Sequence, residues 1–221
     1  MRLQIVSDSG NRPPGVPMKY LLALLLLLTG CTQTVAPSAG PTSQSPSASS
    51  SETATPSATP ICSPMGGTPV PCSAEEYQKV EEQNRLTEEA IALYRRWTKE
   101  STRLYRAGGT NKATPEMLAT TAGDFRASVL GIFQDVKAAR AKATSGEVKI
   151  ITIEPDSRVQ PERGGAAITA CLDARSLKFY RDGKKLRDGP IFFENVVAKP
   201  IDGRLKLWSV HSGGVESCPS S

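Results

Sequence analysis

Cysteine and histidine are the residues of this chain best suited to chemistry, and there are few of them. The sequence has five cysteines and a single histidine, His211. An imidazole can act as a general base, while thiols form disulfides, bind metals or carry lipids. A zinc site is disfavoured because His211 is the only nitrogen ligand available. No P-loop, GxGxxG, GxSxG, HExxH or paired CxxC motif occurs, so neither a cofactor nor a metal is expected.

A leucine-rich run before Cys31 predicts where the protein is located. The apolar stretch 21–28 follows Lys19 and is far shorter than the roughly twenty residues of a membrane-spanning helix. Such a run is typical of a signal peptide. The motif LTGC at 28–31 resembles the bacterial lipobox, which implies cleavage before Cys31 and diacylation of its thiol. Two acyl chains anchor a protein stably, so we expect a lipid anchor on the extracytoplasmic face of the cell membrane.

The N-terminal part of the chain is thus divided into a leader and a tether. Residues 1–30 are predicted to be the signal peptide, and a start of translation at Met18 would give the same mature protein. Residues 31–72 are predicted to be the lipidated cysteine followed by a disordered linker. From Thr32 to about Pro60 nearly every residue is Ser, Thr, Pro, Ala or Gly, which cannot bury enough apolar surface to fold.

The four remaining cysteines are predicted to be structural. Disulfides persist outside the cytoplasm, and four cysteines allow three pairings. Cys62 and Cys72 flank the turn-rich segment SPMGGTPVP, and their spacing is too long for a redox CxxC pair. Cys171 and Cys218 both lie in the C-terminal half. The sequence therefore favours Cys62–Cys72 together with Cys171–Cys218.

Residues 73–221 have the size of one domain, which begins with helical patterns. Ser73 and Glu76 form a capping box, and the helix that follows is expected to end near Arg106. Thr114 caps a second helical segment, which is expected to break at Gly123 and to end near 144–146. Apolar residues recur at helical spacing in the first helix: Tyr77, Val80, Ala90, Leu93, Tyr94, Trp97, Leu104 and Tyr105.

After Gly146 the pattern changes to the alternation of strands. Strands are predicted at 148–153, 166–172, 191–198 and 204–211, with 177–181 continuing the second one past a bulge. Helices followed by an antiparallel meander indicate an α+β fold. We therefore expect N-terminal helices packed on a curved antiparallel four-stranded sheet.

Charged residues of both signs are interspersed along this domain. The tightest basic cluster is Lys184, Lys185 and Arg187, within RDGKKLRDG. It is interpreted as a solvated hairpin tip, and contact with an anionic lipid or polymer is the alternative. Basic and aromatic residues do not interleave, so no nucleic-acid partner is expected.

The order of these elements resembles the nuclear-transport-factor-2-like (SnoaL-like) cone. The ending RLKLWSVHSGGVESC, with ACLD on an earlier strand, is similar to a group of actinobacterial secreted lipoproteins in which a tryptophan strand runs into a Gly-Val-x-x-Cys tail. The resemblance covers roughly residues 77–218. It implies that a Cys171–Cys218 bridge holds the chain end against the sheet. The positions that carry it are Trp208, Gly214, Val215 and Cys218, with Cys171 and Asp173 on the partner strand.

The resemblance also implies a pocket between the helices and the sheet, where enzymes of this fold place acid–base groups. Strict alternation puts His211 on the same side of its strand as Leu205 and Leu207, and Asp173 across the sheet could orient it. A histidine at the rim of the sheet is the alternative. Four aromatic residues could line such a pocket or simply form the core: Tyr94, Trp97, Tyr105 and Trp208.

Two hypotheses for function follow. In the first, the domain is a non-catalytic binding or interaction module for a partner protein, an envelope polymer or a small apolar ligand, and a homodimer through the sheet is a further option. In the second, it is a small SnoaL-like isomerase or hydratase that uses His211 and Asp173. The first is favoured because the sequence shows no convergent cluster of titratable residues.

Overall fold

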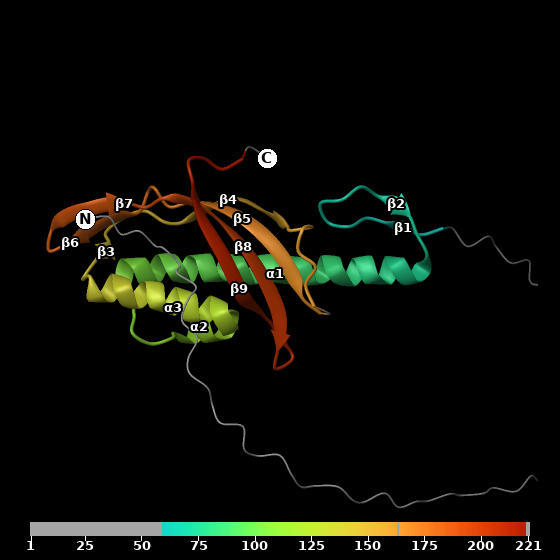
Figure 1. Cartoon of the computed structure of the whole chain (residues 1–221), viewed down its shortest axis with the longest axis horizontal. Coiled ribbons are helices and arrows are strands. Elements are labelled where there is room, and N and C mark those ends of the chain that lie inside the picture. The colour runs from blue at the N-terminus through green and yellow to red at the C-terminus, as the bar shows by residue number, and fades with distance from the viewer. Residues whose placement is uncertain (1–58, 163, 220–221) are drawn as a thin grey trace, which may run out of the picture. The chain divides into compact units, whose positions relative to one another are not determined.

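The computed structural model describes residues 59–162 and 164–219. The signal peptide, the lipidation site Cys31 and residues 32–58 of the predicted linker lie outside the described residues. Figure 1 shows the described domain as helices on one side of a twisted antiparallel sheet. This is the α+β architecture with a four-stranded sheet that the sequence predicts. In the described ranges, none of the helices combines the length and apolar character needed to cross a membrane.

Helix α1, Ala74–Ala107, is the longest element and has well-defined ends. At its start the Ser73 hydroxyl accepts a hydrogen bond from the Glu76 backbone N–H, and the Glu76 carboxylate accepts one from the Ser73 N–H. At its end Gly108 adopts a left-handed conformation, which glycine tolerates without steric cost. The predicted apolar stripe is buried from Ala90 to Leu104, and Tyr105 is half-buried. Tyr77, in contrast, is 40% exposed because the first turns of α1 extend beyond the core.

The second helical segment forms two helices, α2 (Pro115–Thr120) and α3 (Gly123–Ala138). The Thr114 hydroxyl caps α2, as predicted, by accepting from the Met117 N–H at 3.1 Å. The break at Gly123 was also predicted. The predicted end of α3 was wrong: the helix stops at Ala138 because the chain then turns to form strand β3, Lys142–Ala143.

The main sheet has the strand order β4-β5-β8-β9, with every neighbouring pair antiparallel. Its inner face packs against α1, and its outer face points away from that helix. The strands begin and end close to the predicted positions, except that β8 and β9 are longer. Their bounds are β4 Lys149–Pro155, β5 Ala166–Asp173, β8 Ile191–Ile201 and β9 Arg204–Val215.

Two smaller sheets differ from the predictions. Strands β6 (Lys178–Arg181) and β7 (Lys184–Asp188) form a hairpin that pairs with β3, so β6 does not continue β5. Strands β1 (Ile61–Cys62) and β2 (Val70–Pro71) form a second hairpin within a segment predicted to be disordered linker. The ordered unit therefore begins before residue 73.

The structure contains the two disulfides that the sequence favours. Cys62–Cys72 closes the β1–β2 hairpin, which the side chain of Asn84 fastens to α1 by hydrogen bonds to the backbone of Ser63 and Met65. Cys171–Cys218 fastens the C-terminal tail to the middle of strand β5. Cys171 lies on the outer face, because its neighbours along β5 point into the core.

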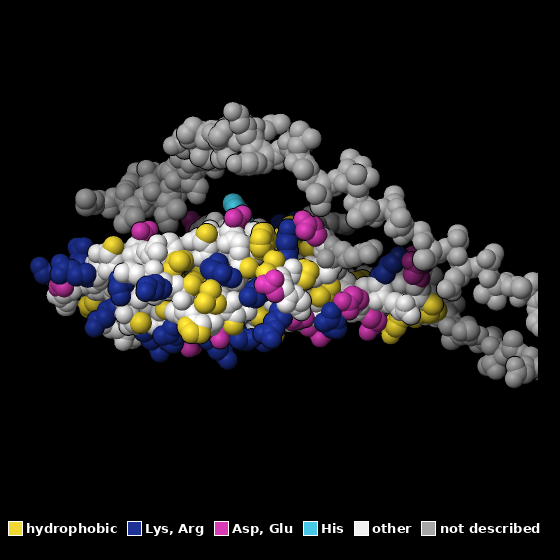
Figure 2. Space-filling view, turned by 90° about the horizontal axis from the view of Figure 1, so that it is seen from below, with side chains coloured by type: hydrophobic (Ala, Val, Ile, Leu, Met, Phe, Trp, Pro, Cys, Tyr) yellow, Lys and Arg dark blue, Asp and Glu magenta, His cyan; other side chains and the backbone are white. Residues whose placement is uncertain are grey.

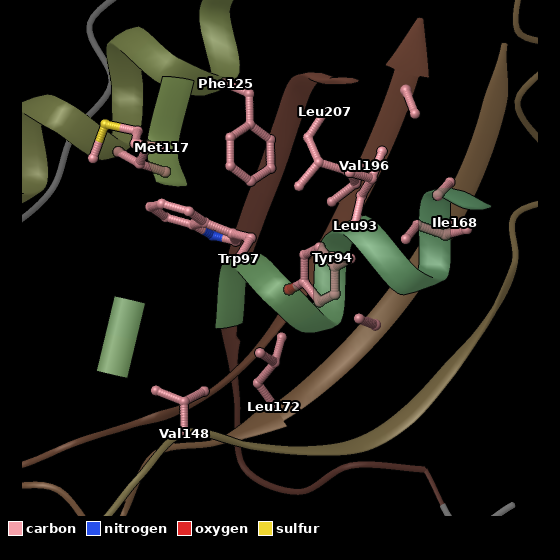
Figure 3. Packing of buried hydrophobic residues seen from close by; sticks show 14 of the residues in the cluster. Leu93, Tyr94, Trp97, Met117, Phe125, Val148, Ile168, Leu172, Val196 and Leu207 are labelled. Carbon is pink, nitrogen blue, oxygen red and sulfur yellow. The ribbon is translucent and has the colours of Figure 1, made fainter. Parts of the chain in front are cut away.

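The core lies between α1, α2, α3 and the inner face of the sheet (Figure 3). Trp97 makes edge-on contacts with Phe125 and Phe133, at centroid distances of 5.6 and 6.1 Å. Leu207 and Ile168 on the sheet are completely buried beneath the helices. Close-packed side chains thus occupy the space where the cone resemblance predicts a pocket.

Candidate functional site

A β-bulge in strand β9 changes the expected position of His211. Val197 on β8 pairs with Ser209, whereas the next residue, Ala198, pairs with Leu207. Trp208 is therefore an extra residue that reverses the alternation beyond it. Val210 now packs on the core, and His211 is exposed on the outer face. The prediction that His211 shares a side with Leu205 and Leu207 was wrong for this reason.

Asp173 also lies on the outer face, but not beside His211. His211 pairs with Asn195, which pairs with Thr169, four residues before Asp173 on β5. Strand geometry then puts the Cα atoms of His211 and Asp173 roughly 16 Å apart. The Asp173 carboxylate instead accepts from the guanidinium of Arg175 at 2.7 Å, and these hydrogen bonds lower its pKa to about 2. The structure does not bring the two predicted acid–base residues together.

The four predicted pocket aromatics are packing residues in this structure. Tyr94 and Trp97 are buried in the core, and Tyr105 packs against Phe133 with ring centroids 4.9 Å apart. Burial raises the pKa of Tyr105 to about 12. Trp208 lies within the edge strand β9, where its ring packs against Gly123. The Nζ atom of Lys199 is 5.5 Å from the Trp208 ring.

One polar pair connects α1 to the inner face of the sheet. The Tyr94 hydroxyl donates to the Glu194 carboxylate at 2.5 Å, and the Ser212 hydroxyl donates to the other carboxylate oxygen at 3.2 Å. Burial raises the pKa of Glu194, and the hydrogen bond from Tyr94 opposes that rise. Burial, followed by the nearby Glu194 charge, raises the pKa of the Tyr94 hydroxyl. The pair orients α1 on β8, and sequence reasoning missed it because the partners are 100 residues apart.

The residues most suited to binding surround a hollow of about 340 Å³ on the outer face. The hollow lies between the segment that follows β4 and the C-terminal half of β9. Its lining combines apolar residues with amide, hydroxyl and imidazole groups. The lining residues are Asp156, Val159, Ala167, Asn195, Val196, Val197, Ser209, Val210 and His211.

A chain of polar contacts holds one side of this hollow in place. The Asp156 carboxylate is almost fully buried and accepts from the Arg158 Nε at 2.9 Å and Nη2 at 3.0 Å. The Thr169 hydroxyl lies 3.1 Å from Asp156 and 3.0 Å from the Asn195 side-chain oxygen. A hydroxyl has one proton, and the charged carboxylate is the stronger acceptor. Asn195 thus keeps hydrogen-bonding capacity toward the hollow, opposite His211.

The chemistry of Asp156 favours a structural role over proton transfer. Hydrogen bonds from Arg158 hold the pKa of this carboxylate below its ordinary value, outweighing the effect of burial. It therefore stays ionised at neutral pH and is a weak base. Asp173 and Arg175 form the same arrangement, in which an aspartate accepts hydrogen bonds from the arginine two positions later. The Asp-x-Arg pattern also occurs at 124–126, inside helix α3, and at 202–204, so by itself it does not locate these two turns.

The arrangement can offer hydrogen bonds and apolar contacts to a bound group. Its rim includes exposed His211, half-buried Asn195 and Ser209, beside apolar Ala167 and Val197. In the residues that the structure describes, no group of three or more His, Cys, Asp or Glu residues is placed to hold a metal ion.

Comparisons with known proteins add little to this picture. No protein-family model matches the chain, and no curated protein matches it. Among solved structures, the intermembrane-space region of the chloroplast protein ARC6 aligns with 59% of this chain and 97% of its own length. That alignment has 13% identity and a TM-score of 0.31, which carries no argument about function. The resemblance to actinobacterial SnoaL-like lipoproteins stays a prediction.

Proposed function

We propose that the protein is a lipid-anchored, extracytoplasmic interaction module that binds a partner protein with the exterior of its domain. The packed interior is the observation that carries this proposal. Tyr94 and Leu207 have no exposed surface and Trp97 is 5% exposed, so side chains fill the space between α1 and the sheet. A partner is then bound at the surface, where the outer-face hollow is a recessed feature with polar groups at its rim.

The sheet edge beside the hollow suits an extended peptide of the partner. β9 is an edge strand, and the contacts that cover it come from Thr121 and Ala122 at Leu207. Within the described ranges, no strand pairs with the outer edge of the segment 209–215. An extended peptide can form backbone hydrogen bonds along such an edge and place one side chain in the adjacent hollow.

The anchoring part of the proposal rests on the lipobox motif at 28–31, and the two disulfides support an oxidising compartment. Replacement of Cys31 by serine tests the anchor. We expect the variant to leave the membrane fraction or to keep its leader, which gel mobility and detergent partitioning would detect. A Cys31→Ser protein that stays membrane-bound at unchanged size would refute the anchor.

The binding part is tested by photo-crosslinking in intact cells. A photoreactive residue at His211 should crosslink to one defined protein, whereas the same residue at exposed Arg95 on α1 should not. The identified protein is then purified, and its affinity is measured with Val197→Trp, a change that fills the hollow. Equal crosslinking from both positions, or unchanged affinity for Val197→Trp, would show that the outer face is not the binding surface.

A further inference from the structure

One end of the domain carries a strong positive charge, and we call it the basic pole. It comprises residues 139–143 and 178–188, which contain strands β3, β6 and β7. The formal net charge of the whole chain is +5, and the basic pole alone accounts for that value, so the rest of the chain is balanced. Its basic residues are Arg140, Lys142, Lys178, Arg181, Lys184, Lys185 and Arg187, and its acidic residues are Asp182 and Asp188.

The acidic residues neutralise only part of this charge. Asp188 accepts from both Lys178 and Lys185, at 3.0 and 2.9 Å, and Asp182 lies 3.8 Å from Arg140. Among the residues that the structure describes, no acidic group pairs with the remaining four bases. These are Lys142, Arg181, Lys184 and Arg187.

The unpaired bases lie on an open surface. All residues of β7 are exposed, as are Lys142 and Arg181. Lys142 and Lys185 flank Tyr180 as cross-strand neighbours, so the three side chains share one face of the small sheet. The Arg187 guanidinium lies 5.9 Å from the centre of the Phe179 ring, which restricts its motion. Arg181, Lys184 and Arg187 lie with Phe179 on the other face of this sheet. Unpaired bases on both faces of a short hairpin suit a flexible polymer that bends around its tip.

The basic pole lies at the opposite end of the domain from the point where the chain enters it. Figure 1 shows the β1–β2 hairpin at one end of α1 and the β6–β7 hairpin near the other. Figure 2 shows Lys and Arg side chains at that second end and also along the middle of the visible face. With 34 residues, α1 spans about 51 Å between them. Because the described chain begins at the β1–β2 hairpin, the basic pole is the end of the domain that lies away from the attachment of the linker.

We propose that the basic pole binds a linear phosphodiester polymer outside the cell membrane. This inference rests on the proposed anchor, which places the domain on the extracytoplasmic side. Lysine and arginine are both good phosphate ligands, the first as a compact charge and the second as a planar fork. The position of the pole favours a polymer beyond the membrane over the headgroups at its surface.

The number of unpaired bases sets the expected salt dependence. A polyanion releases roughly 0.7 counterions for each charge that a protein neutralises on a single strand, so four contacts predict a slope of log K against log salt of about −3. The affinity should then fall roughly 50-fold between 50 and 200 mM salt. A protein that contacts the polymer through one base only should lose less than about threefold.

The test uses the purified full chain and fluorescently labelled poly(glycerol phosphate), with binding followed by anisotropy. The test variant is Lys142→Gln/Arg181→Gln/Lys184→Gln, which removes three of the unpaired bases. The matched control is Arg95→Gln/Lys99→Gln/Lys112→Gln, which removes the same residue types from exposed positions outside the pole. Circular dichroism and unfolding curves check that both variants are folded.

The test variant should lose about tenfold or more in affinity at 50 mM salt and show a shallower salt slope, while the control stays within about twofold of the parent. An equal loss in both variants would mean that only net charge matters, and would overturn the proposal. So would the absence of binding at 50 mM salt. Tighter binding to polyglutamate or to phosphatidylglycerol vesicles would overturn the choice of polymer.

This outcome is independent of the anchoring test. Binding to the polymer is measured in solution and does not require the lipid. If the polymer binds but Cys31→Ser stays membrane-bound at unchanged size, the tether is refuted and the basic pole stands. If the polymer does not bind, the basic pole is refuted and the anchor is judged from the Cys31→Ser result.

Discussion

The two disulfides should contribute unequally to stability, because they close loops of different length. Cys171 and Cys218 are 47 residues apart, whereas Cys62 and Cys72 are 10 apart. In the chain-entropy description, the first bridge destabilises the unfolded state by about 4 kcal/mol and the second by about 2.7 kcal/mol. Replacement of each pair by alanine should therefore lower the free energy of unfolding by different amounts.

The position of each bridge widens this difference. Cys171 is 4% exposed in the central strand β5, and its bond fastens a tail that unfolds only with the sheet. Cys62 and Cys72 close a hairpin that contacts the exposed beginning of α1 through Asn84. Without this bridge the hairpin can open locally while the core stays folded, so the free energy of global unfolding changes less.

Equilibrium unfolding in urea, followed by tryptophan fluorescence, measures both effects. The chain has two tryptophans, Trp97 in the core and Trp208 on β9, so the signal reports on global unfolding. We expect Cys171→Ala/Cys218→Ala to lose about 4 kcal/mol and Cys62→Ala/Cys72→Ala to lose less than about 2.7 kcal/mol. Equal losses, or a larger loss from the hairpin variant, would refute the reasoning.

Three further predictions concern single side chains. Trp97→Ala should cost about 3–5 kcal/mol in the same urea experiment, because it leaves a cavity between the helices. Tyr94→Phe should lower the free energy of unfolding by about 1–3 kcal/mol, because the Glu194 carboxylate loses a hydrogen-bond donor. Calorimetry should find this loss larger at about pH 7 than at about pH 4, because Glu194 is more often protonated at the lower pH. Arg175 lowers the pKa of Asp173 from 3.8 to about 2. The stability that this ion pair contributes is therefore fully present above pH 3.8 and is lost as the pH falls toward 2. Asp173→Asn should remove that part of the acid-induced loss of stability, and an unchanged pH profile of the melting temperature would contradict it.

Local signals were sufficient to predict the helix starts and the strand order. Ser73 and Glu76 identify the beginning of α1, and Thr114 with Pro115 identifies that of α2, because capping depends on residues within one turn. The end of α3 could not be predicted in this way. The stretch after Ala138 has good helix propensity, but pairing of β3 with β6 overrides it.

The candidate site depended on features that alternation does not reveal. One extra residue, Trp208, moves His211 to the other face of the sheet, and nothing in the sequence of β9 indicates that a bulge occurs there. The bonds between Asp156 and Thr169 and between Tyr94 and Glu194 join distant parts of the chain. Such contacts follow from tertiary packing, so a single sequence could suggest the residue types but not the site.

The Cys62–Cys72 bridge also determines how tension would pass into the domain. A pull on the chain before Cys62 takes the shorter covalent route through the two sulfur atoms and emerges at Cys72, one residue before the N-cap of α1. Residues 63–71 are bypassed, and the force acts along the first turns of α1. Residues 74–85 of that helix contribute no buried side chain, so they would unwind before the core yields. At 1.5 Å per residue when helical and about 3.4 Å when extended, these twelve residues would lengthen the tether by roughly 20 Å under load while the sheet stays intact.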